Sequence, residues 1–290
     1  MQKLSNIGVI KDILTRYGFA FSKGLGQNFL VNPSICPRMA EQCGAKSGVG
    51  VIEIGAGIGV LTAELCQRAE KVVCIEIDQR LLPILEETVG HYTNLHVINK
   101  DILKVDLKQL IAEEFVGINE IVVCANLPYY LTSPIIMGLL EAKLPIASIT
   151  VMVQKEAALR LCAKPGSREV GAITMGVHYH SQPHLLFHVS RGSFMPAPNV
   201  DSAVIRLDVL KNPSITVLDE AIFFQVIKGS FAQRRKIITN SLCTQFGLDK
   251  ATMIALLDNC GISPNARPEA LTMDHFGRIA DEIKNAQKGL

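Results

Sequence analysis

The pattern of hydrophobic and polar positions changes near residue 210. Before that point, short apolar runs rich in β-branched residues alternate with segments of helical periodicity. Such alternation predicts a mostly parallel sheet with helices on both faces. The expected strands are Val49–Ile54, Lys71–Ile77, Leu95–Ile98, Glu120–Cys124 and Ser148–Val153. The expected helices begin at Asn32-Pro33 and Ser133-Pro134 or cover Gly59–Arg68, Gln79–Val89 and Leu107–Glu114.

From Ala172 onward the pattern favours strands and then helices. Three β-rich runs, ITMGVHYH, HLLFHV and SAVIRLDVL, predict antiparallel strands at one edge of the sheet. After Pro213 the pattern is helical, with expected helices Asp219–Gln245, Leu248–Asn259 and Pro268–Gln287. We therefore expect a Rossmann-like α/β domain over residues 1–210, with an N-terminal arm over 1–31, and a small α-helical domain over 211–290.

Composition narrows the class of protein. Hydrophobic residues make up 48% of the 290 positions, and no run of eighteen apolar residues suggests a membrane span. The eight cysteines form no CxxC pair, which is typical of reduced thiols, and the first residues lack the pattern of a signal peptide. We expect a cytoplasmic protein. The net charge of +2 does not by itself demand a nucleic-acid partner.

A glycine-rich turn follows the first predicted strand of the sheet. The run Glu53-Ile-Gly-Ala-Gly-Ile-Gly59 links that strand to a helix. Glycines allow positive φ and close approach of a ligand, and a helix N-terminus offers free N–H groups. A turn of this kind fits a nucleotide site, a dinucleotide enzyme or a structural turn.

Polar side chains follow the next three strands. Glu76, Asp101 and Asn126 each stand at or just beyond the carboxyl end of a predicted strand. Parallel strands bring these ends to one rim of the sheet, and a carboxylate after the second strand can accept hydrogen bonds from ribose hydroxyls. Asp101 could instead cap the following helix. Together with the glycine turn, they predict a cofactor that contains a nucleoside, with nicotinamide and sulfonium cofactors both open.

The tetrapeptide Asn126-Leu-Pro-Tyr129 favours methyl transfer to an adenine amine. That amine is a weak nucleophile, and an enzyme helps by orienting it and accepting its hydrogens. The Asn126 amide oxygen and the Leu127 carbonyl can do so, while Tyr129 offers a ring on which a flipped base can stack. Phe194, in the loop FMPAPNV, could form the opposite wall.

These motifs resemble the ribosomal RNA adenine dimethyltransferase family. SKGLGQNFL, EIGAGIGVLT, IEID, KDIL, NLPYY, RGSFMPAPNVDSAV and FAQRRKIITNSL occur in the family's order, from about Ser22 to about Ala280. The resemblance is greatest to the bacterial small-subunit enzymes linked to kasugamycin sensitivity. It implies S-adenosylmethionine as cofactor and dimethylation of two adjacent adenines near the 3′ end of small-subunit RNA, without a metal.

The resemblance also implies roles for individual residues. The cofactor is expected to contact Asn28, Leu30, Gly55, Gly57, Glu76, Ile77, Asp101, Ile102 and Asn126. Asn126 and Leu127 are expected to hold the target amine, and Tyr129 and Phe194 to sandwich the adenine. Arg234, Arg235 and Lys236 are expected to contact RNA phosphates. The expected partner is small-subunit RNA or a preassembled small subunit, and the protein is expected to be a monomer that binds no membrane.

Other interpretations remain open at this level. The sister enzymes that methylate a large-subunit adenine share the Asn-Leu-Pro-Tyr loop, and a non-catalytic assembly factor could keep the fold. A nicotinamide dehydrogenase would not explain that loop. The histidines between His178 and His188 are expected at the surface or facing RNA rather than on a metal. Val170 stands where the family pattern suggests an aromatic residue in an RNA-facing loop.

Overall fold

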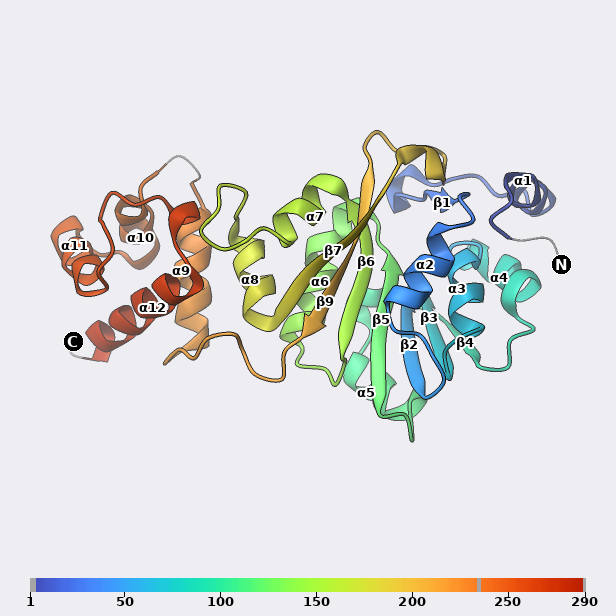
Figure 1. The fold of residues 1–290 in the computed structure, drawn as a ribbon, viewed down its shortest axis with the longest axis horizontal. Helices are drawn as coiled ribbons and strands as arrows, with labels where there is room; N and C mark the ends of the chain where they lie inside the picture. Colours follow the sequence, from blue (N-terminus) through green and yellow to red (C-terminus); the bar gives the residue numbers. More distant parts are fainter. Residues whose placement is uncertain (1–3, 234–235, 289–290) are drawn as a thin grey trace. The chain divides into compact units, whose positions relative to one another are not determined.

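The computed structural model describes residues 4–233 and 236–288 of the chain (Figure 1). The chain forms two compact units. The first comprises Met1–Ala158 and Pro183–Val209, and the second comprises Leu159–Gln182 and Leu210–Leu290. One division follows Val209, next to the boundary expected after residue 210, and the second unit also includes Leu159–Gln182, which the sequence pattern assigned to the first.

A seven-stranded sheet forms the centre of the described fold, in the order β4-β3-β2-β5-β6-β9-β7. Its strands are β2 (Val49–Ile54), β3 (Lys71–Glu76), β4 (Leu95–Asn99), β5 (Glu120–Asn126), β6 (Ser148–Gln154), β7 (Ser181–Val189) and β9 (Ser202–Val209). The first five are parallel, and β9 runs antiparallel to β6. Every residue of β2 is buried, as its mostly apolar pattern predicts for a strand covered on both faces, and the burial includes the carboxyl side chain of Glu53.

The strand order reverses on the two sides of β2, and this reversal locates the site. From β2 the chain proceeds to β3 and β4 in one direction, and later to β5 and β6 in the other. Ile54 lies beside Ile75 of β3 on one side and Ala125 of β5 on the other. Open α/β sheets bind ligands outside the carboxyl ends of their strands at such a reversal. The glycine turn after β2 and Asn126 at the end of β5 both lie there.

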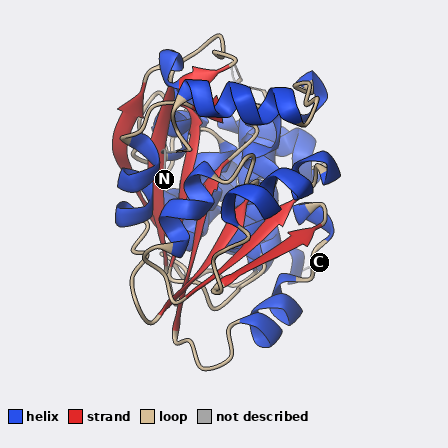
Figure 2. Ribbon diagram, turned by 90° about the vertical axis from the view of Figure 1, so that its right-hand side faces the viewer, coloured by secondary structure: helices blue, strands red, loops and turns tan. Residues whose placement is uncertain are grey.

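Helices lie on both sides of the strands (Figure 2). The helices before β7 are α1 (Ile7–Arg16), α2 (Ile35–Gln42), α3 (Val60–Cys66), α4 (Leu82–Val89), α5 (Leu107–Glu114), α6 (Thr132–Glu141), α7 (Lys155–Leu161) and α8 (Ala172–His180). Short 3-10 turns are η1 (Lys23–Leu25), η2 (Gln79–Leu81), η3 (Ile102–Lys104), η4 (Tyr129–Leu131) and η5 (Arg191–Ser193). A separate two-stranded ribbon pairs β1 (Phe29–Leu30) with β8 (Phe194–Met195). The predicted Rossmann-like α/β fold is confirmed.

The strand expected over ITMGVHYH is wrong, because this segment forms helix α8. At its start the Gly171 N–H donates to the Thr174 hydroxyl, which in turn donates to the Arg160 carbonyl. Met175 and Tyr179, four residues apart, lie on one face of the helix and join the core of the second unit. Tertiary packing of that face outweighs the β propensity of the isolated segment.

The second unit is completed by C-terminal helices. These are α9 (Glu220–Phe231), α10 (Ile238–Phe246), α11 (Lys250–Asn259), η6 (Pro268–Ala270) and α12 (Met273–Lys288). The single helix expected over Asp219–Gln245 is therefore two helices, and Asp219 is the N-cap of the first. The break falls at the basic run, where Arg234 and Arg235 lie outside the described residues. Lys236 is exposed in the turn before α10.

Two residues that were expected to face solvent or RNA are buried in the second unit. His180 is buried, with its ring stacked on Phe224 at 5.8 Å between centroids, so its expected surface position is wrong. Val170 is also buried in that core, where its smaller side chain affects packing rather than an RNA-facing loop. His184 is partly exposed and lies 3.3 Å from Asp208.

Among the described residues there is neither a cluster suited to a metal ion nor a helix suited to a membrane span. No group of three or more histidine, cysteine or acidic residues is placed to hold a metal ion within residues 4–233 and 236–288. Over the same residues, no helix is both long enough and apolar enough to cross a membrane.

Candidate active site

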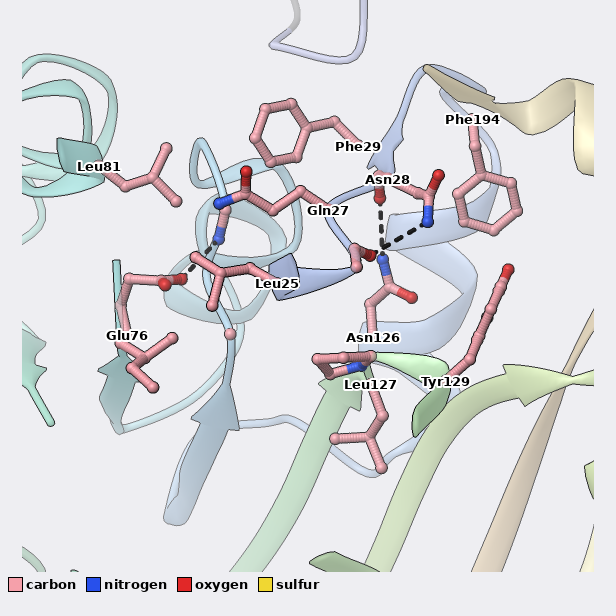
Figure 3. A pocket seen from close by; sticks show the side chains of 15 residues that line it. Leu25, Gln27, Asn28, Phe29, Glu76, Leu81, Asn126, Leu127, Tyr129 and Phe194 are labelled. Carbon is pink, nitrogen blue, oxygen red and sulfur yellow. Dashed lines mark hydrogen bonds between the residues drawn. The ribbon is translucent and has the colours of Figure 1, made fainter. Parts of the chain in front are cut away.

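A pocket opens at the carboxyl ends of β2, β3 and β5, where the strand order reverses (Figure 3). It encloses about 630 Å³, its mouth to solvent included. Its lining combines residues of the N-terminal arm, the glycine turn, the end of β3, the loop after β5, and Phe194. The lining residues are Leu25, Gly26, Gln27, Asn28, Phe29, Gly55, Gly57, Glu76, Ile77, Leu81, Asn126, Leu127, Pro128, Tyr129 and Phe194.

The glycine turn forms the floor of the pocket beside β2. Gly55, Gly57 and Gly59 all have positive φ, which side chains rarely tolerate. A Cβ on Gly57 would lie 3.2 Å from the Phe29 ring, so the arm packs directly on the turn. The turn is thus kept free of side chains where a ligand must approach the backbone.

Glu76 ends β3 at one wall of the pocket (Figure 3). One carboxylate oxygen accepts the Asp78 N–H at 2.9 Å, and the other accepts the Gly57 N–H at 3.1 Å. Burial raises the pKa of Glu76 above its ordinary value, although these two N–H groups favour the charged form. The two bonds fix the carboxylate plane at the pocket wall.

The arm crosses the top of the pocket. The Asn28 side chain donates to the Gly26 carbonyl at 3.1 Å, and the Asn28 carbonyl accepts the Asn126 side-chain amide at 3.4 Å. Phe29 packs against Phe21 and Phe19, with ring centroids 5.2 and 5.9 Å apart. The arm therefore contributes both a polar contact to the end of β5 and an apolar cover.

The loop after β5 places three functional groups together. Because the Asn126 amide nitrogen points to the arm, its oxygen faces the side on which Tyr129 lies (Figure 3). The Leu127 side chain is buried, and its N–H donates to the Met152 carbonyl at 3.2 Å, which anchors the loop to β6. The Tyr129 hydroxyl lies 3.0 Å from the Ser202 hydroxyl, and burial raises the pKa of Tyr129.

Phe194 reaches the pocket through the β1–β8 ribbon. Its partner in the ribbon is Leu30, and Met195 pairs with Phe29. Figure 3 shows the Phe194 ring and Tyr129 on the same side of Asn126, with the Phe194 ring beyond the hydroxyl end of Tyr129. Residues 165 positions apart, 29 and 194, are therefore brought to one wall by two paired strands.

Three of the predicted cofactor contacts are not part of the pocket lining. Leu30 is buried in the core of the first unit, and its backbone pairs with Phe194, which lines the pocket. Asp101 lies two residues beyond β4 and accepts the Leu103 N–H at 3.0 Å, as the cap of η3. Ile102 lies within η3. The remaining predicted cofactor and catalytic residues line the pocket.

Sequence reasoning did not single out Gln27, Phe29 and Leu81, all of which line the pocket. Gln27 and Phe29 flank Asn28 in the QNFL segment, so their neighbourhood was recognised but not their contacts. Asn99 was also missed. Its side chain donates to the Glu76 carbonyl at 2.8 Å and ties β4 to the end of β3.

The chain is similar to ribosomal RNA methyltransferases over nearly its whole length. A family model described as ribosomal RNA adenine dimethylase matches residues 18–285. The chain is 49% identical to the ribosomal RNA small subunit methyltransferase A of Anoxybacillus flavithermus, over 94% of each chain. It is 48% identical to the protein of that name from Geobacillus thermodenitrificans, over 95% of each chain.

Solved structures agree on the fold. The 23S rRNA methyltransferase ErmE is 26% identical, with a TM-score of 0.66, over 89% of this chain and all of its own. A dimethyladenosine transferase from Plasmodium falciparum is 24% identical, with a TM-score of 0.73, over 90% of this chain and 98% of its own. The fold described above is therefore shared over nearly the whole chain.

Proposed function

The chain belongs to the ribosomal RNA adenine dimethylase family, and on that premise we propose that its pocket is where a target adenine meets the methyl donor. The protein is an S-adenosylmethionine-dependent enzyme that dimethylates adenine in small-subunit ribosomal RNA. We assign to it two adjacent adenines near the 3′ end of that RNA. We also assign individual residues of the pocket to the cofactor and to the target adenine.

The residues of the pocket fit a nucleoside cofactor. The Glu76 carboxylate uses one lone pair on each oxygen for a backbone N–H, which leaves acceptor capacity for a pair of ribose hydroxyls. The glycine turn is free of side chains, and the Phe29 ring bars one at Gly57. Asn28, Gly55, Gly57, Glu76, Ile77 and Asn126 would hold the cofactor.

Asp101 and Ile102 belong to the same proposal although they lie beside the pocket lining. Both follow β4, which neighbours β3, so they extend the rim on which Glu76 lies. We assign them to the adenine end of the cofactor and Leu30 to support of the arm. When bound, S-adenosylmethionine supplies a methyl group on a positively charged sulfur.

Catalysis by this chain rests on orientation and hydrogen-bond acceptance. Because the Asn126 nitrogen is engaged by the Asn28 carbonyl, the Asn126 oxygen is left to accept a hydrogen of the target amine. The Leu127 carbonyl follows in a loop anchored to β6 and is assigned the second hydrogen. Accepting both hydrogens localises the nitrogen lone pair, and fixed acceptors of this kind need little reorganisation during reaction.

Tyr129 and Phe194 are assigned the target base. Both rings line the pocket and lie on the same side of Asn126 (Figure 3), and stacking on aromatic rings is the common way to hold a flipped base. The hydrogen bond between Tyr129 and Ser202 fixes the tyrosine ring, since Ser202 is buried at the start of β9. A rigid stacking face places the amine in line with the methyl group.

The remaining assignments concern partners and rest on the sequence. We propose that Arg234, Arg235 and Lys236 contact RNA phosphates, that residues 211–290 form the RNA-binding domain, and that the enzyme is a cytoplasmic monomer. Its substrate is small-subunit RNA, either free or in a partly assembled subunit. The large-subunit alternative is disfavoured, because the named relatives above 40% identity are small-subunit enzymes.

The convergence of Glu76, Asn126, Tyr129 and Phe194 on one pocket carries this proposal. It is tested with methyl-labelled S-adenosylmethionine and ribosomal subunits from cells that lack both candidate modifications. Label is expected as dimethyladenine near the 3′ end of the small-subunit RNA. Label confined to the large subunit, or no label on either subunit, would contradict the assignment.

A further inference from the structure

The Asp78 side chain accepts hydrogen bonds from two segments, the N-terminal arm at Gln27 and the turn after β3 at Arg80. It lies two residues beyond Glu76, and its side chain is buried. One oxygen accepts the Arg80 backbone N–H at 3.1 Å and the Arg80 Nε at 2.9 Å. The other accepts the Gln27 side-chain amide at 2.7 Å and the Arg80 Nη2 at 2.6 Å. The Arg80 guanidinium lowers the pKa of Asp78, so the carboxylate is held ionised.

The same network holds the arm at three successive points. The Gln27 side-chain oxygen accepts the Ser22 N–H at 2.9 Å, so its amide bridges the arm to Asp78. Arg80 donates to the Ala20 carbonyl at 3.3 Å, and its guanidinium lies 4.9 Å from the centroid of the Phe19 ring. Contacts of this type add to apolar cover in fixing a segment that has little secondary structure of its own.

Asn28 and Phe29 follow Gln27 in the chain, and they contact opposite ends of the pocket. Phe29 packs on Gly57 at the cofactor end, and the Asn28 carbonyl accepts the amide of Asn126 at the target end. Displacement of the arm would therefore uncover the glycine turn and release the Asn126 amide together. A contact that holds the arm therefore affects both the cofactor end and the target end of the pocket.

Capping of η2 does not account for this arrangement. A cap needs one side-chain oxygen, which accepts the Arg80 N–H. The second oxygen is directed to Gln27, which is 51 residues earlier in the chain. The Gln27 amide is half-buried and satisfied at both its oxygen and its nitrogen, so its place in the arm depends on Asp78.

We propose that Gln27 and Asp78 form a latch that positions the arm over the pocket and thereby couples cofactor binding to the orientation of Asn126. The latch rests on the proposed function, because the pocket it closes is the one assigned to the cofactor. Gln27 and Asp78 are positioning residues, since neither is assigned a contact with a reacting atom.

The test exchanges the two chemical groups of the latch. Gln27→Glu replaces the donating amide by a carboxylate that faces Asp78, and like charges at that distance repel. The double variant Gln27→Glu/Asp78→Asn restores one amide and one carboxylate with the direction of the hydrogen bond reversed. Asp78→Asn alone is the reference for the double variant, because both lose the charge opposite Arg80. Gln79→Glu, at an exposed position beside the latch, controls for added negative charge.

Binding of S-adenosylhomocysteine is measured by calorimetry, and backbone amide exchange is measured over residues 17–30. Gln27→Glu is expected to weaken binding about tenfold and to speed exchange in the arm, as loss of a charged hydrogen bond does. The double variant is expected within about threefold of Asp78→Asn in affinity, because the restored pair is coupled. Gln79→Glu should match the wild type.

Two outcomes would overturn the latch. One is an affinity and arm exchange in Gln27→Glu equal to those of the wild type. The other is a double variant whose loss of affinity equals the product of the losses in Gln27→Glu and Asp78→Asn, since substitutions at independent sites combine in that way. A wild-type chain that binds no S-adenosylhomocysteine would overturn the proposed function instead, and the exchange rates would still report on the latch.

Discussion

The two ends of the pocket are built in different ways. At the cofactor end, the glycine turn and Glu76 belong to one continuous stretch, from β2 through α3 to β3. Both strands are buried and hydrogen-bonded to each other, so the relative positions of Gly57 and Glu76 follow from local chain geometry. At the target end, Asn126, Tyr129 and Phe194 come from the loop after β5 and the β1–β8 ribbon, and the Asn28 carbonyl of the arm accepts the Asn126 amide.

This difference indicates where each end is vulnerable. The cofactor end depends on backbone shape and one carboxylate, and its parts fold together as a unit of the sheet. The target end depends on contacts between distant segments, such as the Asn28–Asn126 bond and the Leu30–Phe194 pairing. Substitutions should therefore separate cofactor binding from turnover, and the variants below test that separation.

The largest effect is expected from Tyr129→Ala. Loss of base stacking should lower kcat/KM for RNA by about 100-fold, since one stacked base contributes up to about 3 kcal/mol. Affinity for S-adenosylhomocysteine should change little, because Tyr129 is assigned to the target end. Steady-state kinetics and calorimetry measure the two quantities on one preparation.

One substitution at the same position and one at the next residue serve as controls for Tyr129→Ala. Tyr129→Phe keeps the ring and loses only the hydrogen bond to Ser202. Its kcat/KM for RNA should fall roughly fivefold, as loss of one neutral hydrogen bond predicts. Tyr130→Ala removes a ring that is 57% exposed and outside the pocket lining, and tests whether the position matters rather than any aromatic ring. Equal loss of cofactor affinity and turnover in Tyr129→Ala would contradict its role.

A smaller effect is expected from Glu76→Ala, at the opposite end. Loss of the carboxylate should weaken cofactor binding about 30-fold, as hydrogen bonds to a charged acceptor predict. RNA affinity in the absence of cofactor should be unchanged. A change confined to RNA affinity would contradict the assigned contact with the ribose.

The pH dependence of binding gives an independent check on Glu76. The ionised carboxylate is the form that accepts both hydroxyls, and burial raises its pKa. Wild-type affinity should therefore fall on acidification at a pH higher than that of an ordinary glutamate. In Glu76→Ala this part of the pH dependence should disappear, and an identical profile for both proteins would show that another group titrates.

The smallest effect on cofactor binding and turnover is expected from Glu53→Gln, because Glu53 lies in the interior of β2 and away from the strand end. Glu53 is fully buried, and neither carboxylate oxygen has a well-formed hydrogen bond among the described residues. Burial raises its pKa to about 8, although the Thr62 hydroxyl lies close enough to favour the charged form. Its folded pKa thus exceeds the unfolded value, and the folded state binds the extra proton.

The sign of the stability change follows from that difference. Between the unfolded pKa and about pH 8, the contribution of Glu53 to the free energy of unfolding should fall as pH rises, because this carboxyl ionises first in the unfolded chain. Glu53→Gln should flatten this decline in urea unfolding curves measured across that window. Glu41→Gln, at an exposed glutamate, is the matched control. A difference in stability between the wild type and Glu53→Gln that does not fall over this interval would contradict the buried neutral carboxyl.

Most of the parallel sheet was predictable because its strands are covered on both faces. The expected bounds of β2 agree with the structure, and those of β3 to β6 differ by at most two residues. Such strands are continuous apolar runs, and the intervening helices show their own period. The segment Ala172–His180 was predicted wrongly because its apolar residues suit either period, and contacts of Met175 and Tyr179 in the second unit decide for helix.

The sequence by itself determined the cofactor end of the site. A glycine turn and an acidic residue at the ends of neighbouring parallel strands must share a rim, whatever the rest of the chain does. Only the tertiary structure decided the cover of that rim: Phe29 on Gly57, Gln27 on Asp78, and the arm carbonyl on Asn126. These contacts join residues about 30 to 100 positions apart, and side-chain packing and hydrogen bonding across such separations leave no periodic pattern in the sequence.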